Sequence, residues 1–75
     1  MVIETGYYLK DNYIYGPGAE SGEFYLGADQ YIYGPINSGL YYLKDGKIYG
    51  NGQNGQFYFE NNYLHGPETT PPWEK

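Results

Sequence analysis

The only histidine of the chain, His65, is the first residue to consider for chemistry, because its charge ordinarily changes near neutral pH. A catalytic His needs a nucleophile and an orienting group within reach. The only serines, Ser21 and Ser38, fall in Gly-containing joints away from it, and the nearby Glu60 and Glu68 with a single imidazole make a weak zinc site. We therefore expect no enzyme activity, metal or cofactor, and interpret His65 as a variant of a tyrosine position.

Tyrosine offers a different chemistry, since it fills 12 of the 75 positions. Phenol rings present apolar faces to sugars, organic cations or lipid, and their hydroxyls add hydrogen bonds. We take as candidate ligand-binding residues eight side chains that recur at two equivalent positions, together with the single Trp: Tyr8, Tyr25, Tyr42 and Tyr58; Tyr15, Tyr33, Tyr49 and His65; and Trp73. Cross-strand aromatic pairs also stabilise a sheet by about 0.2–1 kcal/mol each, so a purely structural role is the alternative.

These recurring positions come from one segment written four times. The copies are YYLKDNYIYG (7–16), FYLGADQYIYG (24–34), YYLKDGKIYG (41–50) and FYFENNYLHG (57–66), and a tail follows at 67–75. Ten or eleven residues with a short joint are the length of a β-hairpin. The sequence thus predicts a single domain over 1–75, built from four hairpins.

Turn residues in the middle of each copy support the hairpins. Asp45-Gly46 between strand-like residues is the strongest short-range hairpin signal, because a type I′ turn needs positive φ at both central positions. Asp11-Asn12 and Asn61-Asn62 stand at the same place in two other copies, and both residue types tolerate that conformation. The second copy has one extra residue, at 27–30, and predicts a longer turn.

A two-residue turn fixes the register of a hairpin and therefore its two faces. In the first copy Leu9 then faces Ile14, and Tyr8 faces Tyr15. Alternation of side chains puts Leu, Ile and Phe, with Tyr7 and Tyr41, on one face and ten of the twelve tyrosines on the other. Both faces are apolar enough to be buried, so the pattern leaves open which one points inward.

Four hairpins in sequence can pair edge to edge as an all-β, eight-stranded antiparallel sheet. Closing the first strand on the last removes both edges and gives a pseudo-four-fold shallow barrel. An open hairpin solenoid is the alternative, but its end copies usually depart from the consensus, whereas here the first copy is as regular as the third. We therefore predict closure.

The tail carries Trp73 behind Pro71-Pro72, which favour an extended segment. A frayed end is one interpretation. We expect instead that the tail folds back and Trp73 plugs one mouth of the barrel, because a chain short of core gains about 3 kcal/mol or less by burying the indole.

The repeats and the tail together resemble the bacterial β-flower proteins in their four-fold form. The resemblance rests on Tyr-Ile-Tyr-Gly-Pro at 13–17 and 31–35, on the related ends of the other copies, and on Thr70-Pro71-Pro72-Trp73, so it covers nearly the whole chain. It implies a shallow symmetric barrel whose hairpins splay like petals. It implies no particular activity.

The charge balance narrows the partners. The net charge is −5 and there is no Arg, which argues against nucleic acid. No apolar run is long enough for a membrane-spanning helix, and the first residues do not look like a signal peptide, so we expect a cytoplasmic protein, with a membrane-peripheral place left open.

The function predicted is that of a non-enzymatic binding or interaction module. Its ligand, a glycan, a quaternary amine, a lipid headgroup or another protein, would contact a concave or mouth-facing tyrosine surface. The alternative is a structural module that oligomerises through its aromatic face. A glycan, amine and lipid screen would separate the two.

Overall fold

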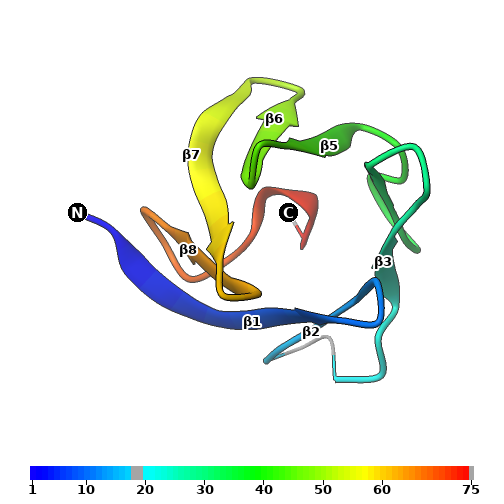
Figure 1. The fold of residues 1–75 in the computed structure, drawn as a ribbon, viewed down its shortest axis with the longest axis horizontal. Helices are drawn as coiled ribbons and strands as arrows, with labels where there is room; N and C mark the ends of the chain where they lie inside the picture. The colour runs from blue at the N-terminus through cyan, green and yellow to red at the C-terminus, as the bar shows by residue number, and fades with distance from the viewer. Residues whose placement is uncertain (18–19, 75) are drawn as a thin grey trace.

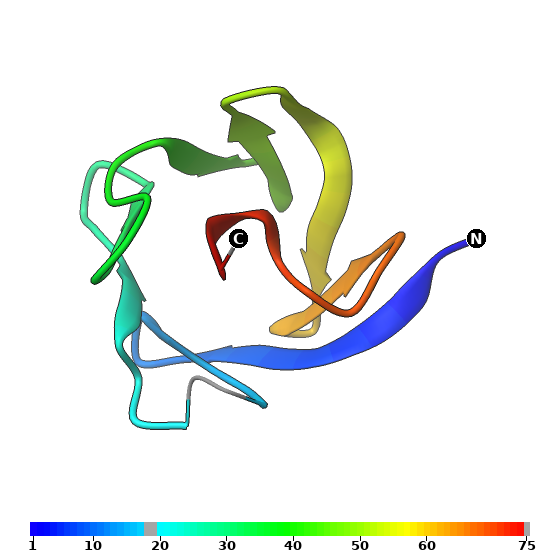
Figure 2. The ribbon, with the colours of Figure 1, turned by 180° about the vertical axis from the view of Figure 1, so that it is seen from behind.

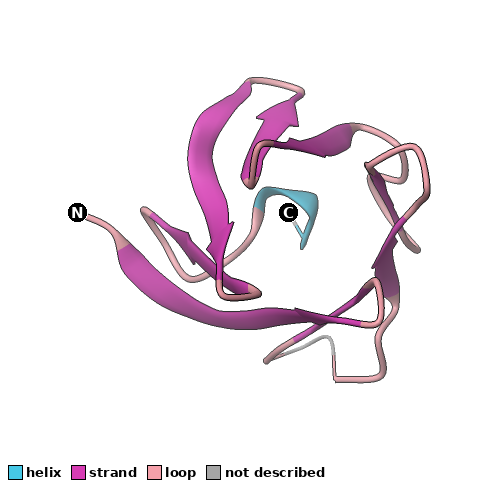
Figure 3. Ribbon diagram, in the orientation of Figure 1, coloured by secondary structure: helices cyan, strands magenta, loops and turns pink. Residues whose placement is uncertain are grey.

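Eight antiparallel strands follow one another around a closed barrel in the computed structural model, which describes residues 1–17 and 20–74 (Figure 1). The elements are β1 (Ile3–Lys10), β2 (Tyr13–Tyr15), β3 (Phe24–Leu26), β4 (Tyr31–Tyr33), β5 (Tyr41–Lys44), β6 (Lys47–Gly50), β7 (Gln53–Glu60), β8 (Tyr63–Gly66) and the 3₁₀ turn η1 (Pro72–Glu74). Strands make up nearly all of the regular structure in the described ranges (Figure 3). The predicted all-β barrel is confirmed; Lys75, the last residue of the tail, lies outside the described residues.

The predicted turns set the predicted registers. Three hairpins have two-residue turns in which both central residues have positive φ, as a type I′ turn requires. These turn residues are Asp11 (53°) and Asn12 (69°), Asp45 (54°) and Gly46 (80°), and Asn61 (54°) and Asn62 (69°). Leu9 accordingly lies opposite Ile14, and Leu43 opposite Ile48. The β3–β4 hairpin has the longer loop that its extra residue predicts, ending at Gln30 with φ of 71°.

One backbone hydrogen bond recurs wherever a hairpin meets the hairpin before it. An amide near the end of the first strand of each hairpin donates to the carbonyl of a turn residue in the preceding hairpin, at 2.7–2.8 Å. The four pairs are Leu9 to Asn62, Leu26 to Asn12, Leu43 to Gln30 and Phe59 to Gly46. Because the first of these joins β1 to the last hairpin, the same contact that links neighbouring hairpins also closes the barrel.

Two strands are longer than predicted. β1 begins at Ile3 and β7 at Gln53, each several residues before the repeated segment. Both contain a glycine with positive φ, Gly6 (91°) and Gly55 (82°), and the register of each strand shifts near that glycine. A glycine of this kind makes a β-bulge that bends a strand without ending it. Gly6 and Gly55 therefore bend their strands and do not end them.

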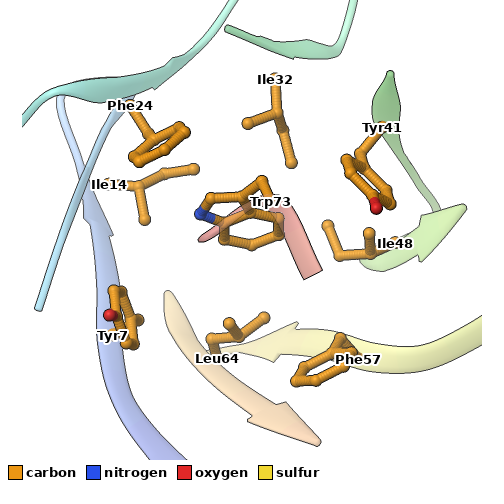
Figure 4. Close-up of a cluster of buried hydrophobic side chains, with 9 residues drawn as sticks. All are labelled: Tyr7, Ile14, Phe24, Ile32, Tyr41, Ile48, Phe57, Leu64 and Trp73. Carbon is orange, nitrogen blue, oxygen red and sulfur yellow. The ribbon is translucent and has the colours of Figure 1, made fainter. Parts of the chain in front are cut away.

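The aliphatic and phenyl face points inward. The first strands of the hairpins supply Tyr7, Phe24, Tyr41 and Phe57, and the second strands supply Ile14, Ile32, Ile48 and Leu64. All eight side chains are buried and surround Trp73 (Figure 4). Leu9, Leu26, Leu43 and Phe59 are partly buried against this core. The core face predicted from the sequence is thus confirmed, and its inward direction is settled.

The tail turns back into the ring of strands after β8. The turn η1 lies near the centre of the ring when seen from either side (Figures 1 and 2). Trp73 is 0% exposed, and Pro71 and Pro72 are buried with it. The side-chain amide of Asn37 donates to the carbonyl of Trp73 at 3.0 Å. The predicted docking of Trp73 is confirmed.

The glycine that ends each Tyr-Ile-Tyr-Gly stretch makes room for an aromatic ring. A Cβ placed on Gly34 would lie 2.3 Å from a ring carbon of Phe24, and one on Gly16 would lie 2.5 Å from a ring carbon of Tyr7. Gly66 has the same relation to Phe57, at 2.3 Å. These glycines therefore allow the inner rings to cover the backbone of the second strand.

Candidate binding surface on the outside of the barrel

The tyrosines that are not in the core stand on the outer surface of the barrel. Because successive side chains of a strand point to opposite faces, the register that sends Leu, Ile and Phe inward sends these rings outward. Five of them are clearly exposed: Tyr63 (52%), Tyr13 (47%), Tyr25 (43%), Tyr31 (39%) and Tyr8 (38%). The remaining outer candidates, Tyr15, Tyr33, Tyr42, Tyr49, Tyr58 and His65, are half-buried.

The outer rings form rows that run across three neighbouring strands. We name each row after its central ring: the Tyr8 row (Tyr63, Tyr8, Tyr15), the Tyr25 row (Tyr13, Tyr25, Tyr33), the Tyr42 row (Tyr31, Tyr42, Tyr49) and the Tyr58 row (Lys47, Tyr58, His65). Members of a row are directly opposite one another in the ladder. The four rows together are called the outer tyrosine belt.

Three of the four rows combine two kinds of ring contact, and the Tyr58 row has only the first kind. Within a hairpin the central ring stacks on its partner, with centroids 5.2–5.8 Å apart and interplanar angles of 16–29°. Across the junction to the neighbouring hairpin, the contact is tilted, with centroids 5.3–6.1 Å apart and angles of 45–55°. In a stacked pair each ring covers a face of the other, so these faces stabilise the pairing of the two strands and are not open to a ligand. The rings at the tilted ends keep more surface for solvent.

Glycines in the joints cover the stacked ends of two rows. A Cβ on Gly22 would lie 2.9 Å from Cε1 of Tyr15, and one on Gly39 would lie 3.6 Å from Cε1 of Tyr33. Both glycines have positive φ, 71° and 77°, which lets the joint turn over the ring. Part of the ring surface of Tyr15 and Tyr33, two of the candidate ligand contacts, is therefore covered by a joint.

Three of the five most exposed rings are ones that the sequence analysis did not choose. Tyr13, Tyr31 and Tyr63 occupy the tilted ends of three rows and stand beside the hairpin turns. The alternation of side chains already put them on the same face as the chosen rings. Their place next to the turns, where fewer neighbours can cover a ring, was the signal that could have identified them.

The extra residue of the second hairpin supplies a carboxylate to the Tyr25 row. Asp29 accepts a hydrogen bond from the hydroxyl of Tyr33 and one, at 3.1 Å, from the backbone amide of Tyr31. The bond from Tyr33 stabilises the ionised carboxylate and lowers the pKa of Asp29, with the Tyr31 amide as the second cause. The same bond, since the hydroxyl must keep its proton to donate, raises the pKa of Tyr33.

The Tyr58 row departs from the other three. Lys47 takes the place of the tilted Tyr, and His65 stacks on Tyr58 with centroids 5.2 Å apart and an angle of 16°. Glu4 lies opposite His65 across the β1–β8 pairing. His65 thus has the position predicted for it, as the counterpart of Tyr15, Tyr33 and Tyr49. The described residues contain no group of three His, Cys, Asp or Glu side chains that could hold a metal ion.

Trp73 does not share a surface with the other candidate residues, since it is buried inside the barrel. Beside it, the hydroxyl of Tyr7 donates to the carbonyl of Pro17 at 2.6 Å. Burial raises the pKa of Glu74, and the charge of Glu23 adds to this, while the nearby Tyr7 hydroxyl acts in the opposite direction. Burial and the nearby Glu74 carboxylate also raise the pKa of Tyr7.

The expectation of a concave or mouth-facing tyrosine surface is wrong. No pocket is found over the described ranges 1–17 and 20–74. The reason is physical: Trp73 and the inner side chains fill the interior, and the outer rings stand on a closed sheet that curves away from the solvent. Within the same ranges no helix is long and apolar enough to cross a membrane.

Comparison of the chain with protein-family models, curated proteins and solved structures finds no match. The class of the protein is therefore defined by its own architecture, a closed eight-stranded antiparallel barrel with a belt of tyrosines outside and a tryptophan from its tail inside.

Proposed function

We propose that the protein is a non-enzymatic binding module whose ligand contacts the outer tyrosine belt. One observation carries this proposal: five tyrosines are 38–52% exposed and each touches another ring of the belt, although other side chains already fill the core. Aromatic side chains lower the free energy of binding more than most, and a connected exposed apolar surface commonly marks an interaction site.

The shape of the belt favours a ligand that lies along it. Aromatic cages for small quaternary amines surround the cation, whereas these rings stand side by side on a convex sheet with stacked faces. Glycans, lipid headgroups and extended segments of other proteins can contact ring edges and hydroxyls from one side. We therefore rank them above a small caged amine.

A panel titration followed by NMR tests the proposal. A neutral oligosaccharide, a choline-type amine, a lipid micelle and a short peptide are added separately to labelled protein. The expected result is a saturable shift of the ring signals of Tyr13, Tyr25 and Tyr63 with one probe, while buried Tyr7 and Tyr41 stay unchanged. Failure of every probe to move any belt tyrosine would rule the proposal out.

Self-assembly through the belt is the second candidate, and the same exposed rings are the observation behind it. A net charge of −5 opposes the close approach of identical copies, which is why we rank it lower. Sedimentation over a range of protein concentrations distinguishes the two. A mass that rises with concentration, and returns to one chain when Tyr63 and Tyr13 are replaced by Ser, would favour assembly over ligand binding.

We also propose that the chain is a member of the bacterial β-flower family. The support is the closed barrel of consecutive hairpins together with the stretches that carry the resemblance, Tyr-Ile-Tyr-Gly-Pro and the terminal Pro-Pro-Trp. An experimental structure that superposes on a family member through all eight strands and the Trp would establish membership. A different strand order would refute it.

A further inference from the structure

Positive charge is missing from one continuous part of the chain. Between Lys10 and Lys44 there is no Lys, Arg or His, but there are four carboxylates, those of Asp11, Glu20, Glu23 and Asp29. The remainder of the chain carries all four lysines and the histidine among its five carboxylates. The net charge of the molecule is therefore concentrated in this part.

This stretch supplies four neighbouring strands of the barrel, β2, β3, β4 and β5. Only the last residue of β5, Lys44, lies outside it. Their outer surface carries Tyr13, Tyr25 and Tyr31, exposed by 47%, 43% and 39%. We call these tyrosines, with half-buried Tyr42 and the carboxylate of Asp29, the acidic tyrosine face. Lys10 lies opposite Tyr13 and marks its edge.

The Asp29 carboxylate of this face is held in place. It accepts hydrogen bonds from the Tyr33 hydroxyl and the Tyr31 amide, so it stays ionised and cannot swing away from the row without losing both. The face thus presents fixed negative charge next to ring edges and hydroxyls.

The opposite side of the barrel provides an internal comparison. Figure 1 places β3 and β7 across the ring from each other. There, the Tyr58 row has Lys47 where the Tyr25 row has Tyr13, and Lys44 lies directly opposite Lys47. Like charges opposed in a sheet are unfavourable and would repel a cationic ligand. Glu4 lies opposite His65 and Glu60 opposite Tyr63, so this side carries charges of both signs, whereas β3 and β4 carry no Lys, Arg or His.

We propose that the acidic tyrosine face is a docking surface for an extended Lys- and Arg-rich segment of a partner protein. The inference rests on the proposed binding function and names the class of its ligand. Ammonium and guanidinium groups are attracted to aromatic rings and to carboxylates, and guanidinium also stacks on ring planes. An extended segment suits a convex surface that offers no pocket over the described ranges, because it can contact rings on several strands at once.

The test titrates labelled full-length protein with a short Lys-Arg peptide and, in parallel, with a Glu peptide and a Gly-Ser peptide of equal length. The expected shifts fall on Tyr25, Tyr31 and Asp29, leave Tyr58 and His65 unmoved, and weaken with added salt. The Glu and Gly-Ser peptides should give none. Shifts distributed equally over both sides of the barrel would mean nonspecific attraction to an acidic protein and would overturn the proposal.

Two variants at equivalent positions sharpen the test. Tyr25→Thr removes the central ring of the acidic tyrosine face, and Tyr58→Thr removes its counterpart in the row that carries Lys47. The first should weaken peptide binding about two- to five-fold, and the second should leave it unchanged. Equal effects of the two would contradict the proposal. Unchanged dispersion of the backbone NMR signals shows that both variants remain folded.

The other probes distinguish the docking proposal from the broader proposal that the protein is a binding module. If the Lys-Arg peptide does not bind while an oligosaccharide or a lipid micelle moves the belt tyrosines, the docking proposal fails and the binding module stands. If no probe moves them, both fail. A choline-type amine that binds as tightly as the peptide and moves the same signals would replace the partner segment by a small organic cation, and would also overturn the docking proposal.

Discussion

At the scale of single residues, Trp73 has the largest effect on what the other aromatics can do. It is the only Trp, it comes from outside the repeats, and its side chain is 0% exposed at the centre of the core. An eight-stranded barrel leaves an interior that side chains must fill. Because the indole fills this interior, the core is complete without the side chains of the outer tyrosines.

Removing the indole should therefore be costly. Trp73→Ala deletes a fully buried side chain, and such changes cost about 3–5 kcal/mol. Since domains of this size are stable by only about 3–5 kcal/mol, urea titration should find this variant largely unfolded, and Trp73→Phe folded but weakened. Tyr63→Ala, which removes an exposed ring, is the control and should change stability much less. Similar losses for Trp73→Phe and Tyr63→Ala would contradict the role given to Trp73.

Glu74, next to Trp73, makes stability depend on pH. Its pKa is raised chiefly by burial, so the folded protein binds this proton more tightly than the unfolded chain. Stability should then fall as pH rises from the ordinary Glu range through the raised pKa, and level off above it. Asp29, whose pKa is lowered, acts in a separate window: it contributes stability that is lost as pH falls below the ordinary Asp range.

Glu74→Gln should abolish the fall with rising pH, which thermal melts across the acidic range can measure. Glu60→Gln, on an exposed carboxylate of the outer face, is the matched control and should keep it. Identical pH profiles for wild type and Glu74→Gln would show that this carboxyl does not cause the dependence.

At the scale of elements, the hairpins show how an aromatic ring and a glycine act as one unit. Phe24 covers Gly34 so closely that any Cβ there would overlap the ring, and Tyr7 and Phe57 relate to Gly16 and Gly66 in the same way. The two-residue turns predict which residues lie opposite each other, but not that a ring lies over the glycine, since that depends on the side-chain direction inside the closed barrel.

Gly34→Ala should destabilise the fold by about 1–3 kcal/mol, because the added methyl group must displace the Phe24 ring. A double-mutant cycle with Phe24→Leu measures the contact: once the ring is gone, the same Gly34→Ala change should cost clearly less. Denaturant titration of the four proteins gives the coupling energy. Additive effects would show that the ring and the glycine do not interact as described.

Most of the arrangement of the strands was predictable, because turn types and the alternation of side chains along a strand depend on residues close together in the sequence. Asp45-Gly46 and the Asn and Asp pairs fixed the turns, and the turns fixed the registers and faces. The bulges at Gly6 and Gly55 were not predictable, because a glycine with positive φ can either end a strand or bend it. Which of the two happens depends on whether a neighbouring strand continues to pair beyond it.

At the scale of the whole molecule, closure decides which residues can meet a ligand. The sequence left open which face points inward, since both are apolar, and the prediction of a concave tyrosine surface failed on that point. Closing the sheet with Ile14, Ile32 and their equivalents inside puts the tyrosines on the convex side. The unequal exposure of Tyr63 and Tyr15 likewise follows from turns and joints that come together only in the closed barrel.

The central claim is that an inner core built around Trp73 leaves a belt of tyrosines facing solvent, and solvent accessibility of the aromatic rings tests it most directly. A soluble paramagnetic reagent attenuates the NMR signals of exposed side chains. Strong attenuation is predicted for Tyr63 and Tyr13, little for Tyr7 and Tyr41, and none for Trp73. Protection of Tyr63 and Tyr13 equal to that of Tyr7, or attenuation of Trp73 like that of a frayed tail, would contradict the account.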